Sequence, residues 1–374
     1  MTTATLKRRA LVVKIGTSTL ATQDGGLDEA YLEDLAGQVR AIYDAGRACV
    51  LVSSGAGLAG RGAVDMTGVP RSMALKQATA AIGQGRLMQR YGEAFAKHGL
   101  VVAQILLTRD DFDDRKRFVN AANTLRTLIG LGVVPIINEN DSVAVDEIKV
   151  GDNDTLAALV AGLIDTELLI LLSDIEGLFT ADPNKDSEAT LIPIVTDIKS
   201  LRAHIGGSSS AVGTGGMKTK LAAAELCLRA NIPMVIAHGR AENVLVRAWA
   251  GRSGTRFEPV QPKGLTARKR WIAAGQRSKG SLTIHVNAQS QLISRGRSLL
   301  PAGVTAVTGD FSAGELVELI DQSGTVFARG IVNYDHESVV KIMGLRTAQI
   351  RLKFGDMPTE EIIHRDNLVV CAPL

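Results

Sequence analysis

The sequence predicts an α/β protein: a three-layer αβα sandwich around a mainly parallel sheet, followed by a small β-rich domain. The chain has 374 residues, more than one hydrophobic core usually supports, so two domains are expected. Up to about residue 250, short apolar runs alternate with longer segments of helical periodicity, as in parallel strands joined by crossover helices. Beyond Pro259 the runs are short and alternate between apolar and polar residues, which is typical of half-buried strands.

Each strand predicted in the first domain is an almost uninterrupted apolar run, as expected where helices cover both faces of a sheet. These strands are expected at Ala10–Ile15, Cys49–Val52, Val101–Leu106, Val133–Ile137, Leu168–Leu172 and Pro233–Ala237. Between the first two, apolar residues recur at helical spacing, at Leu32, Leu35, Val39 and Ile42. Asp28 is suited to cap that helix and Gly46 to stop it, which completes a strand–helix–strand unit.

The domain boundary is predicted after Pro259, where charge and pattern both change. Basic residues follow, with no acidic residue before Asp310: Lys263, Arg268, Lys269, Arg270, Arg277 and Lys279. We expect an α/β domain over residues 1–258, a basic linker over 259–279, the β-rich domain over 280–358 and a C-terminal tail over 359–374.

Composition excludes several classes of protein. The hydrophobic fraction is 45% and the charged fraction 22%, and no apolar run approaches the roughly 18–20 residues that span a bilayer. The start is polar and basic, and Lys14 interrupts the apolar stretch that follows, so a signal peptide is disfavoured and a cytoplasmic protein is expected. The three cysteines and six histidines lack metal-ligand spacing, so no transition-metal site held by the protein is expected.

A lysine is the second-to-last residue of the first predicted strand, and a glycine and hydroxyl residues follow that strand. At the end of an apolar run, Lys14 needs an anionic partner, while Gly16, Thr17 and Ser18 can donate hydrogen bonds to phosphate oxygens. The alternative is a lysine whose long side chain reaches from the sheet edge into solvent. This segment alone leaves both interpretations open.

The second strand leads into a turn that contains a literal G-x-G-x-x-G pattern, at residues 55–60. The acidic residue that a dinucleotide site needs about 20 residues later is missing between Asp65 and Glu93, so we reject such a site. Backbone N–H groups at the start of the next helix, together with the hydroxyl of Ser54, can instead bind an anionic substrate or a phosphate. The alternative is a tight turn between strand and helix.

Two polar stretches interrupt the apolar pattern near expected strand ends. Residues 138–141 (NEND) follow the fourth strand, and residues 151–154 (GDND) precede a helix expected to begin near Thr155, with Asp154 suited to be its N-cap. Grouped carboxylates and amides can bind an ammonium group, orient a lysine, or meet a magnesium ion that brings water and nucleotide phosphates. Capping explains Asp154 but not why several such groups stand together.

Two further segments follow later in the α/β domain. The fifth strand ends in Ser173 and Asp174, and residues 213–220 (GTGGMKTK) open a helix expected over Leu221–Arg229. Glycines before a lysine are typical of a phosphate cradle, but the order is not that of a Walker A loop. A flexible loop ending in Lys220 is still suited to cover ATP, because phosphoryl transfer needs mainly positioning and positive charge.

Taken in order, six segments resemble the motifs of the amino acid kinase family: residues 12–18 (VVKIGTS), 52–56 (VSSGA), 137–141 (INEND), 151–154 (GDND), 171–178 (LLSDIEGL) and 213–220 (GTGGMKTK). The tail is similar to a PUA domain, at residues 299–304 (LLPAGV) and 309–317 (GDFSAGELV). That combination favours the glutamate-phosphorylating branch over acetylglutamate, aspartate or nucleotide kinases. The resemblance implies the amino acid kinase fold and ATP-dependent phosphorylation of the γ-carboxylate of L-glutamate to L-glutamyl 5-phosphate, the first step of proline biosynthesis.

The resemblance also implies roles for single residues. Lys14 and Lys220 would neutralise the transferring phosphoryl group, and Asp154 would position both lysines. Three residues would hold glutamate: Ser54, Asp141 and Asn153. ATP would contact Lys14 and residues of the last two segments, namely Ser173, Asp174, Thr214, Gly215, Gly216, Met217, Lys218, Thr219 and Lys220. Mg²⁺ would be held mainly by the phosphates of ATP.

The partners implied are L-glutamate as substrate, proline as a feedback inhibitor at the glutamate site, further copies of the chain in a dimer or tetramer, and a glutamyl phosphate reductase. Two other classes of function stay open at this point. RNA binding fits the PUA-like domain and the basic linker, although Trp271 is the only aromatic residue of that linker. A nucleotide sensor without catalysis leaves the presence of both lysines and Asp154 unexplained.

Overall fold

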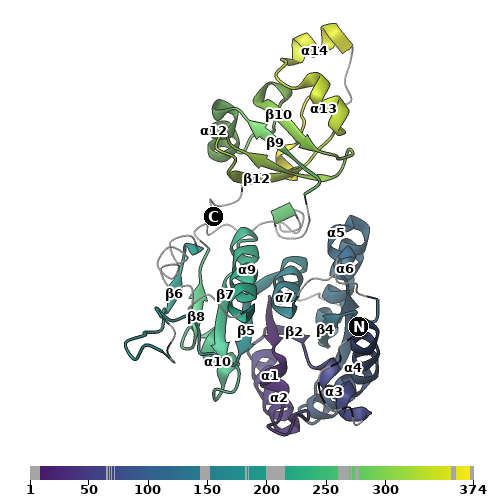
Figure 1. Ribbon diagram of the computed structural model, residues 1–374, viewed down its shortest axis with the longest axis vertical. Coiled ribbons are helices and arrows are strands. Elements are labelled where there is room, and N and C mark those ends of the chain that lie inside the picture. The colour runs from purple at the N-terminus through teal and green to yellow at the C-terminus, as the bar shows by residue number, and fades with distance from the viewer. Residues whose placement is uncertain are drawn as a thin grey trace. The chain divides into compact units, whose positions relative to one another are not determined.

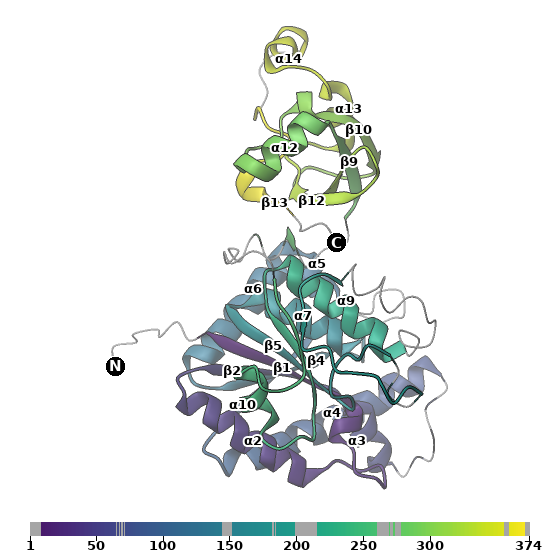
Figure 2. The same cartoon turned by 90° about the vertical axis from the view of Figure 1, so that its left-hand side faces the viewer.

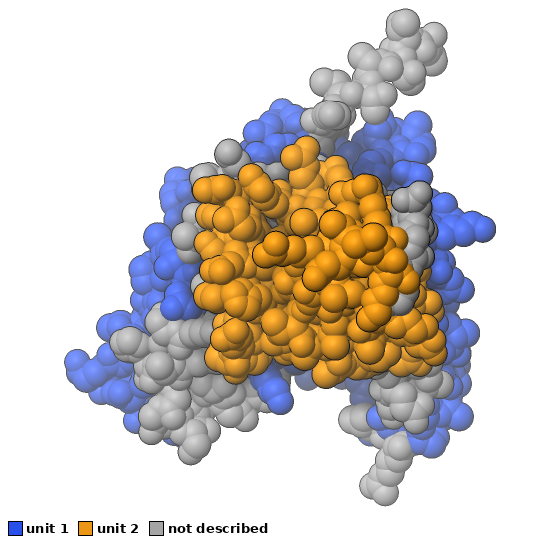
Figure 3. All heavy atoms as spheres, turned by 90° about the horizontal axis from the view of Figure 1, so that it is seen from above, with its two compact units in different colours: residues 1–228, 232–261 blue, residues 229–231, 262–374 orange. Residues whose placement is uncertain are grey.

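The computed structural model shows two compact units (Figure 1). It describes residues 9–64, 66, 68, 70, 72–143, 152–181, 183, 185–198, 215–259, 269, 272–273, 278–354 and 359–370. The first unit comprises residues 1–228 and 232–261, and the second comprises residues 229–231 and 262–374, as the colours of Figure 3 indicate.

The first unit is built around an eight-stranded sheet. Its strands are β1 (Ala10–Ile15), β2 (Ala48–Ser53), β3 (Val102–Leu107), β4 (Val134–Glu139), β5 (Thr166–Ser173), β6 (Ile194–Val195), β7 (Met234–His238) and β8 (Thr255–Phe257). They lie in the order β3-β4-β2-β1-β5-β7-β8-β6, and neighbours are parallel except for β7 and β8. The six predicted strands are confirmed to within two residues at each end. The sequence pattern missed β6 and β8, because two or three residues are too few to form an apolar run.

Helices cover both faces of this sheet, so the predicted αβα sandwich is confirmed. They are α1 (Thr17–Leu20), α2 (Glu29–Asp44), α3 (Ala56–Ala63), α4 (Met73–Ala96), α5 (Asp110–Asp113), α6 (Arg115–Gly130), α7 (Asn153–Leu163), α9 (Gly215–Arg229) and α10 (Val244–Trp249). Figure 2 shows α2, α4 and α10 on one face and α6, α7 and α9 on the other. None of the helices in the described part of the chain is both long and apolar enough to cross a membrane.

Strand alternation decides which side chains of β1 face which helical layer. Leu11, Val13 and Ile15 are fully buried in the core shared with α2, α4 and α10. Side chains of a strand point alternately to opposite faces, so Val12 and Lys14 face the layer that contains α7 and α9. A lysine therefore lies at the carboxyl end of a central strand, beneath the N-termini of two helices.

The helix ends follow from local capping. The amide of Tyr31 donates to Asp28 at the start of α2, and Gly46 adopts a positive φ of 77° just after its end, so both predicted caps are present. The prediction for α7 was wrong in one respect. The helix begins at Asn153, and its N-cap is Asp152, which accepts hydrogen bonds from the amide and hydroxyl of Thr155.

Helices α3 and α4 cross in van der Waals contact because each has a glycine at the crossing point. A Cβ atom on Gly60 would lie 1.8 Å from the carbonyl oxygen of Thr79, and one on Gly83 would lie 1.8 Å from that of Ala56. The glycine pattern at residues 55–60 thus has separate structural uses. Gly55 makes the turn into α3 with a φ of 101°, and Gly60 permits the helix crossing.

The second unit contains a five-stranded sheet in the order β10-β9-β11-β12-β13, with only β9 and β11 parallel. Its elements are β9 (Gly280–Ile284), α12 (Val286–Arg295), η1 (Pro301–Gly303), β10 (Val304–Gly309), β11 (Leu316–Ile320), β12 (Val326–Ile331), α13 (His336–Ile342), α14 (Thr347–Phe354), η2 (Arg365–Asn367) and β13 (Leu368–Val370). The expected β-rich unit is present, with helices that the alternating pattern did not indicate.

One expectation for this region is corrected by the structure, and part of a second one lies outside the described residues. The segment predicted as a C-terminal tail supplies β13, which pairs with β12 and is therefore part of the sheet. Of the basic linker, Lys269 and Lys279 are described, whereas Lys263, Arg268, Arg270 and Arg277 lie outside the described residues.

The helix crossing gives a stability prediction. Gly60→Ala is expected to lower the free energy of unfolding by at least about 3 kcal/mol. The new methyl group would collide with the backbone of α4 and push α3 away from it. Gly57→Ala is the matched control on the same helix, where a Cβ meets nothing within 4 Å and alanine adds up to about 1 kcal/mol of helix propensity. Chemical denaturation of both variants tests this, and equal stabilities would contradict it.

Candidate active site

Polar side chains gather at the carboxyl ends of β1, β2, β4 and β5. This edge is where ligands bind in open α/β sheets, because loops and helix N-termini meet there. It holds Lys14 from β1, Ser54 after β2, Asp141 in the turn after β4, and Ser173 at the end of β5. Across it lie the first turns of α7 and α9, which contribute the remaining candidate residues.

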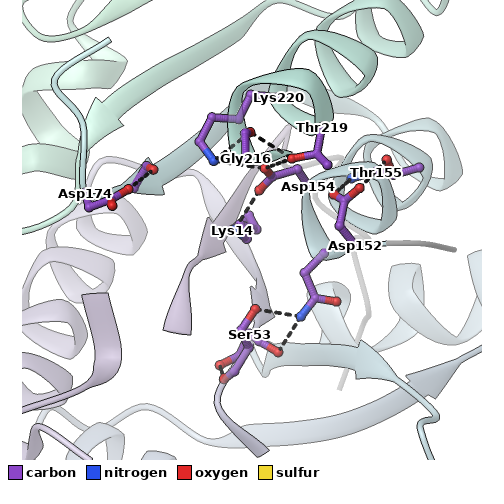
Figure 4. Close-up of polar contacts among 12 residues, drawn as sticks. Lys14, Ser53, Asp152, Asp154, Thr155, Asp174, Gly216, Thr219 and Lys220 are labelled. Carbon is purple, nitrogen blue, oxygen red and sulfur yellow. Dashed lines mark hydrogen bonds and ion pairs between the residues drawn. The ribbon is translucent and has the colours of Figure 1, made fainter. Parts of the chain in front are cut away.

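Two lysines that lie 206 positions apart bind one carboxylate (Figure 4). The Nζ atom of Lys14 lies 2.6 Å from Oδ1 of Asp154, and the Nζ atom of Lys220 lies 3.1 Å from Oδ2 of the same residue. The side chains of Lys14, Asp154 and Lys220 are only 11%, 4% and 10% exposed. The structure thus brings together the three residues to which the sequence analysis assigned catalysis.

The electrostatics of this cluster favour an anion. Burial alone raises the pKa of Asp154, but the neighbouring ammonium groups of Lys14 and Lys220 outweigh burial and hold that pKa below its usual value. Asp154 is therefore ionised at neutral pH. Two ammonium groups and one carboxylate leave a net charge of +1 in a nearly buried position, which an anionic ligand would neutralise.

Two of the three predicted glutamate ligands are in direct contact. The side-chain nitrogen of Asn153, the first residue of α7, donates to the hydroxyl oxygen of Ser54 at 2.8 Å. Asp141 lies in the turn that follows β4 and is half-buried at the same edge of the sheet. The amide of Ser54 donates to the carbonyl of Ile15, which ties this loop to the end of β1 beside Lys14.

The side-chain amide of Asn153 has only one chemically consistent orientation. Its nitrogen faces three acceptors: the Ser54 hydroxyl at 2.8 Å, the Asn138 amide oxygen at 3.1 Å and the Ser53 carbonyl at 3.3 Å. A backbone carbonyl can only accept, so a nitrogen must stand opposite Ser53. The amide oxygen of Asn153 is thereby left as an acceptor, and the Ser54 hydroxyl keeps its own proton to donate elsewhere.

The residues predicted to bind ATP are more widely spread than those predicted to bind glutamate. The hydroxyl of Ser173 donates to the exposed carboxylate of Asp174 at 2.9 Å. The segment predicted to be a loop ending at Lys220 is helical from Gly215, so Gly215, Gly216, Met217, Lys218, Thr219 and Lys220 all lie in α9. Lys218 is exposed and Lys220 is buried. Thr214 lies outside the described residues.

This early helix start has a chemical consequence. Lys220 stands one turn after Gly216, and its ammonium group also approaches the carbonyl oxygen of that glycine at 3.4 Å. Among the described residues, a Cβ on Gly216 would meet nothing within 4 Å. The dipole of a 15-residue helix favours phosphate at its N-terminus.

Three contacts of this site were not predicted from the sequence. Thr219 donates its hydroxyl to Asp154 at 3.1 Å, although its expected role was ATP binding. Asp152 caps α7, and the signal that could have found it was Thr155, three residues later. Asn138 is buried and hydrogen-bonded to Asn153, a contact that no sequence spacing reveals.

Both units match known protein families. Residues 9–238 match the model of the amino acid kinase family, and residues 280–353 match that of the PUA domain. A glutamate 5-kinase from Geobacter sp. (strain M21) is 46% identical over 97% of this chain and 98% of its own length. One from Moorella thermoacetica is 46% identical over 97% and 96%, respectively.

A solved structure supports the same fold. Carbamate kinase from Giardia lamblia bound to AMP-PNP matches with a TM-score of 0.52 and 18% identity, over 68% of this chain and 99% of that protein. With a family model that spans most of the first unit and relatives that match nearly the full length, this chain belongs to the amino acid kinase family.

Proposed function

We propose that this protein transfers the γ-phosphoryl group of ATP to the γ-carboxylate of L-glutamate and forms L-glutamyl 5-phosphate and ADP, the first step of proline biosynthesis. The observation that carries the proposal is the buried Lys14–Asp154–Lys220 cluster, whose net positive charge lies beside the loop of Ser54. The full-length similarity to glutamate 5-kinases supports glutamate as the acceptor.

In the proposed reaction, a carboxylate oxygen of glutamate attacks the γ-phosphorus, and the bond between that phosphorus and the β–γ bridging oxygen breaks. No protein nucleophile is needed. Lys14 and Lys220 stabilise the negative charge on the transferring group, and Asp154 holds both ammonium groups in place before the substrates arrive. Because both ammonium groups are held by ion pairs to one nearly buried carboxylate, little reorganisation is required during the reaction.

The polarity of the second half of the site suits a free amino acid. With its nitrogen committed to three protein acceptors, Asn153 offers its amide oxygen to an ammonium group, and Asp141 supplies a carboxylate for the same purpose. The hydroxyl of Ser54 and the amides at the start of α3 suit the α-carboxylate. An N-acetylated substrate lacks the ammonium group that two such acceptors would bind.

The part of the site proposed to bind ATP is assigned from groups that can donate hydrogen bonds or offer positive charge to phosphate. In the proposal the N-terminus of α9, Lys218 and the pair Ser173 and Asp174 hold ATP, with Lys14 and Lys220 at its γ-phosphate. Mg²⁺ would neutralise phosphate charge and be held mainly by the phosphate oxygens. Within the described ranges, no cluster of three or more His, Cys, Asp or Glu residues is arranged to hold a metal ion.

The proposal extends to partners and organisation. Proline would compete at the glutamate site, copies of the chain would assemble into a dimer or tetramer, and a glutamyl phosphate reductase would consume the acyl phosphate, which is prone to hydrolysis. We assign catalysis to residues 1–258, a linker to 259–279 and the PUA-like unit to 280–358, extended by β13. A cytoplasmic location fits this reaction.

A coupled ADP-release assay tests the proposed function. ATP consumption is expected to depend on L-glutamate and to be at least about 100-fold slower with N-acetylglutamate, because that compound lacks the ammonium group that the site would bind. Aspartate and UMP are also expected to be poor substrates, since neither brings a carboxylate of the same length to the γ-phosphate. Formation of a hydroxamate with hydroxylamine would identify the product as an acyl phosphate. Equal rates with and without glutamate would refute the proposal.

Lys220→Met is expected to lower kcat by about 100- to 1,000-fold and to change the KM for glutamate little, because the charge acts mainly during transfer. The control is Lys116→Met on α6, where the lysine is exposed and takes no part in the ion pairs of Asp154 among the described residues. Steady-state kinetics of both variants would measure kcat and the KM for glutamate. A KM increase without loss of kcat would assign Lys220 to substrate binding instead.

Asp154→Asn is expected to lower the unfolding free energy at pH 7 by about 3–5 kcal/mol, because two nearly buried ammonium groups lose their counter-charge. The folded-state pKa of Asp154 lies below its unfolded value, so the stabilisation is present above about pH 4 and is lost as pH falls through the folded-state pKa. Denaturant unfolding at pH 7, 5 and 3.5 should show the difference between wild type and variant shrinking at the lowest pH. A difference that grows at the lowest pH would contradict a folded-state pKa of Asp154 below its unfolded value.

A further inference from the structure

We propose that Gln84, on helix α4, is a positioning residue that holds the glutamate-binding amide of Asn153 in place through Asn138. The inference rests on the proposed function and deepens it. Gln84 belongs to none of the polar stretches singled out in the sequence, and it lies 69 positions before Asn153.

A chain of three side-chain amides runs from α4 to the substrate edge of the sheet. The Asn138 nitrogen donates to the amide oxygen of Gln84 at 3.0 Å, and the Asn138 oxygen accepts from the Asn153 nitrogen at 3.1 Å. Asn138 is only 4% exposed, so its amide depends on these protein partners rather than on water.

Two backbone groups fix the direction of this chain. The backbone N–H of Glu139 donates to the side-chain oxygen of Asn138 at 2.9 Å, and the carbonyl of Ser53 accepts from the Asn153 nitrogen. Backbone N–H groups only donate and carbonyls only accept, so both asparagine amides have one consistent orientation. The group opposite the Asn138 nitrogen must then be an acceptor, which is the amide oxygen of Gln84.

Helix α4 is held firmly enough to position this acceptor. Gly83, the preceding residue, lies at the close crossing with α3, whose N-terminus follows Ser54. Two turns further along α4, the hydroxyl of Tyr91 lies 2.8 Å from that of Ser53, and both residues are fully buried. The helix therefore contacts the floor of the site at Asn138 and at Ser53.

Loss of the Gln84 acceptor leaves a buried donor on Asn138 without a partner. The backbone N–H of Glu139 still holds the Asn138 oxygen, but the Asn138 nitrogen has lost its acceptor, so the side chain shifts more around its position opposite Asn153. The oxygen of Asn153 then meets the substrate ammonium group with a less constant geometry, so glutamate binds more weakly. Transfer itself is unaffected, because Gln84 makes no contact with Lys14, Asp154 or Lys220 among the hydrogen bonds of the described residues.

Two substitutions of similar size separate the acceptor from the shape of the side chain. Gln84→Met removes the acceptor and is expected to raise the KM for glutamate about three- to tenfold, the worth of one hydrogen bond, with kcat and the KM for ATP within about twofold of wild type. Gln84→Glu keeps an acceptor oxygen and is expected to stay within about twofold in all three constants. Gln89→Met, the same change at an exposed position of α4, is the matched control.

Glutamate-induced thermal stabilisation gives a readout that does not depend on turnover. The concentration of glutamate that produces half of the stabilisation should rise with KM in Gln84→Met and stay unchanged in Gln84→Glu and Gln89→Met. Equal shifts in the Met and Glu variants, or a fall in kcat alone, would overturn the role of Gln84. A wild-type protein that neither consumes ATP with glutamate nor is stabilised by it would overturn the proposed function, and the inference with it.

Discussion

The structure depends on one interaction, the binding of two lysines by the carboxylate of Asp154. Lys14 reaches it from the central strand and Lys220 from α9, so three elements far apart in the chain meet at one buried charge. Without that carboxylate, two like charges would face each other away from water, where repulsion is poorly screened. With it, the cluster keeps one unit of positive charge at a place where helix N-termini also point. Thr219 adds a neutral donor to the same carboxylate.

The acceptor half of the site is held in a different way, by neutral amides and close backbone packing. Gly60 and Gly83 allow α3 and α4 to touch, and the contact holds α4 beside the loop of Ser54. From there Gln84 reaches Asn138, and Asn138 reaches Asn153. Under the proposed function, charge therefore positions the transferring phosphoryl group, and hydrogen-bond direction positions the glutamate. Because the two sets of contacts are separate, binding and turnover could then be altered independently.

Much of the first unit could be predicted from the sequence because its strands are buried on both faces and form continuous apolar runs. The lysine at the end of β1 was visible for the same reason, since a charge there breaks the pattern. The start of α7 was predicted wrongly because Asp152 and Asp154 are both suited to capping, and only the partner at Thr155 distinguishes them. The contact between Gln84 and Asn138 joins residues 54 positions apart, and no pattern in the sequence predicts it.

Three acceptors surround the side-chain nitrogen of Asn153, and this limits which side chains can replace asparagine at position 153. An aspartate has almost the same shape, but it would set a charged oxygen against the oxygens of Ser53, Ser54 and Asn138. Of these, only the serine hydroxyl could turn to donate, so repulsion would remain on two sides. Loss of a single amide nitrogen, by mutation or by chemical ageing of the protein, would therefore disturb four residues at once while leaving the van der Waals outline of the site almost unchanged.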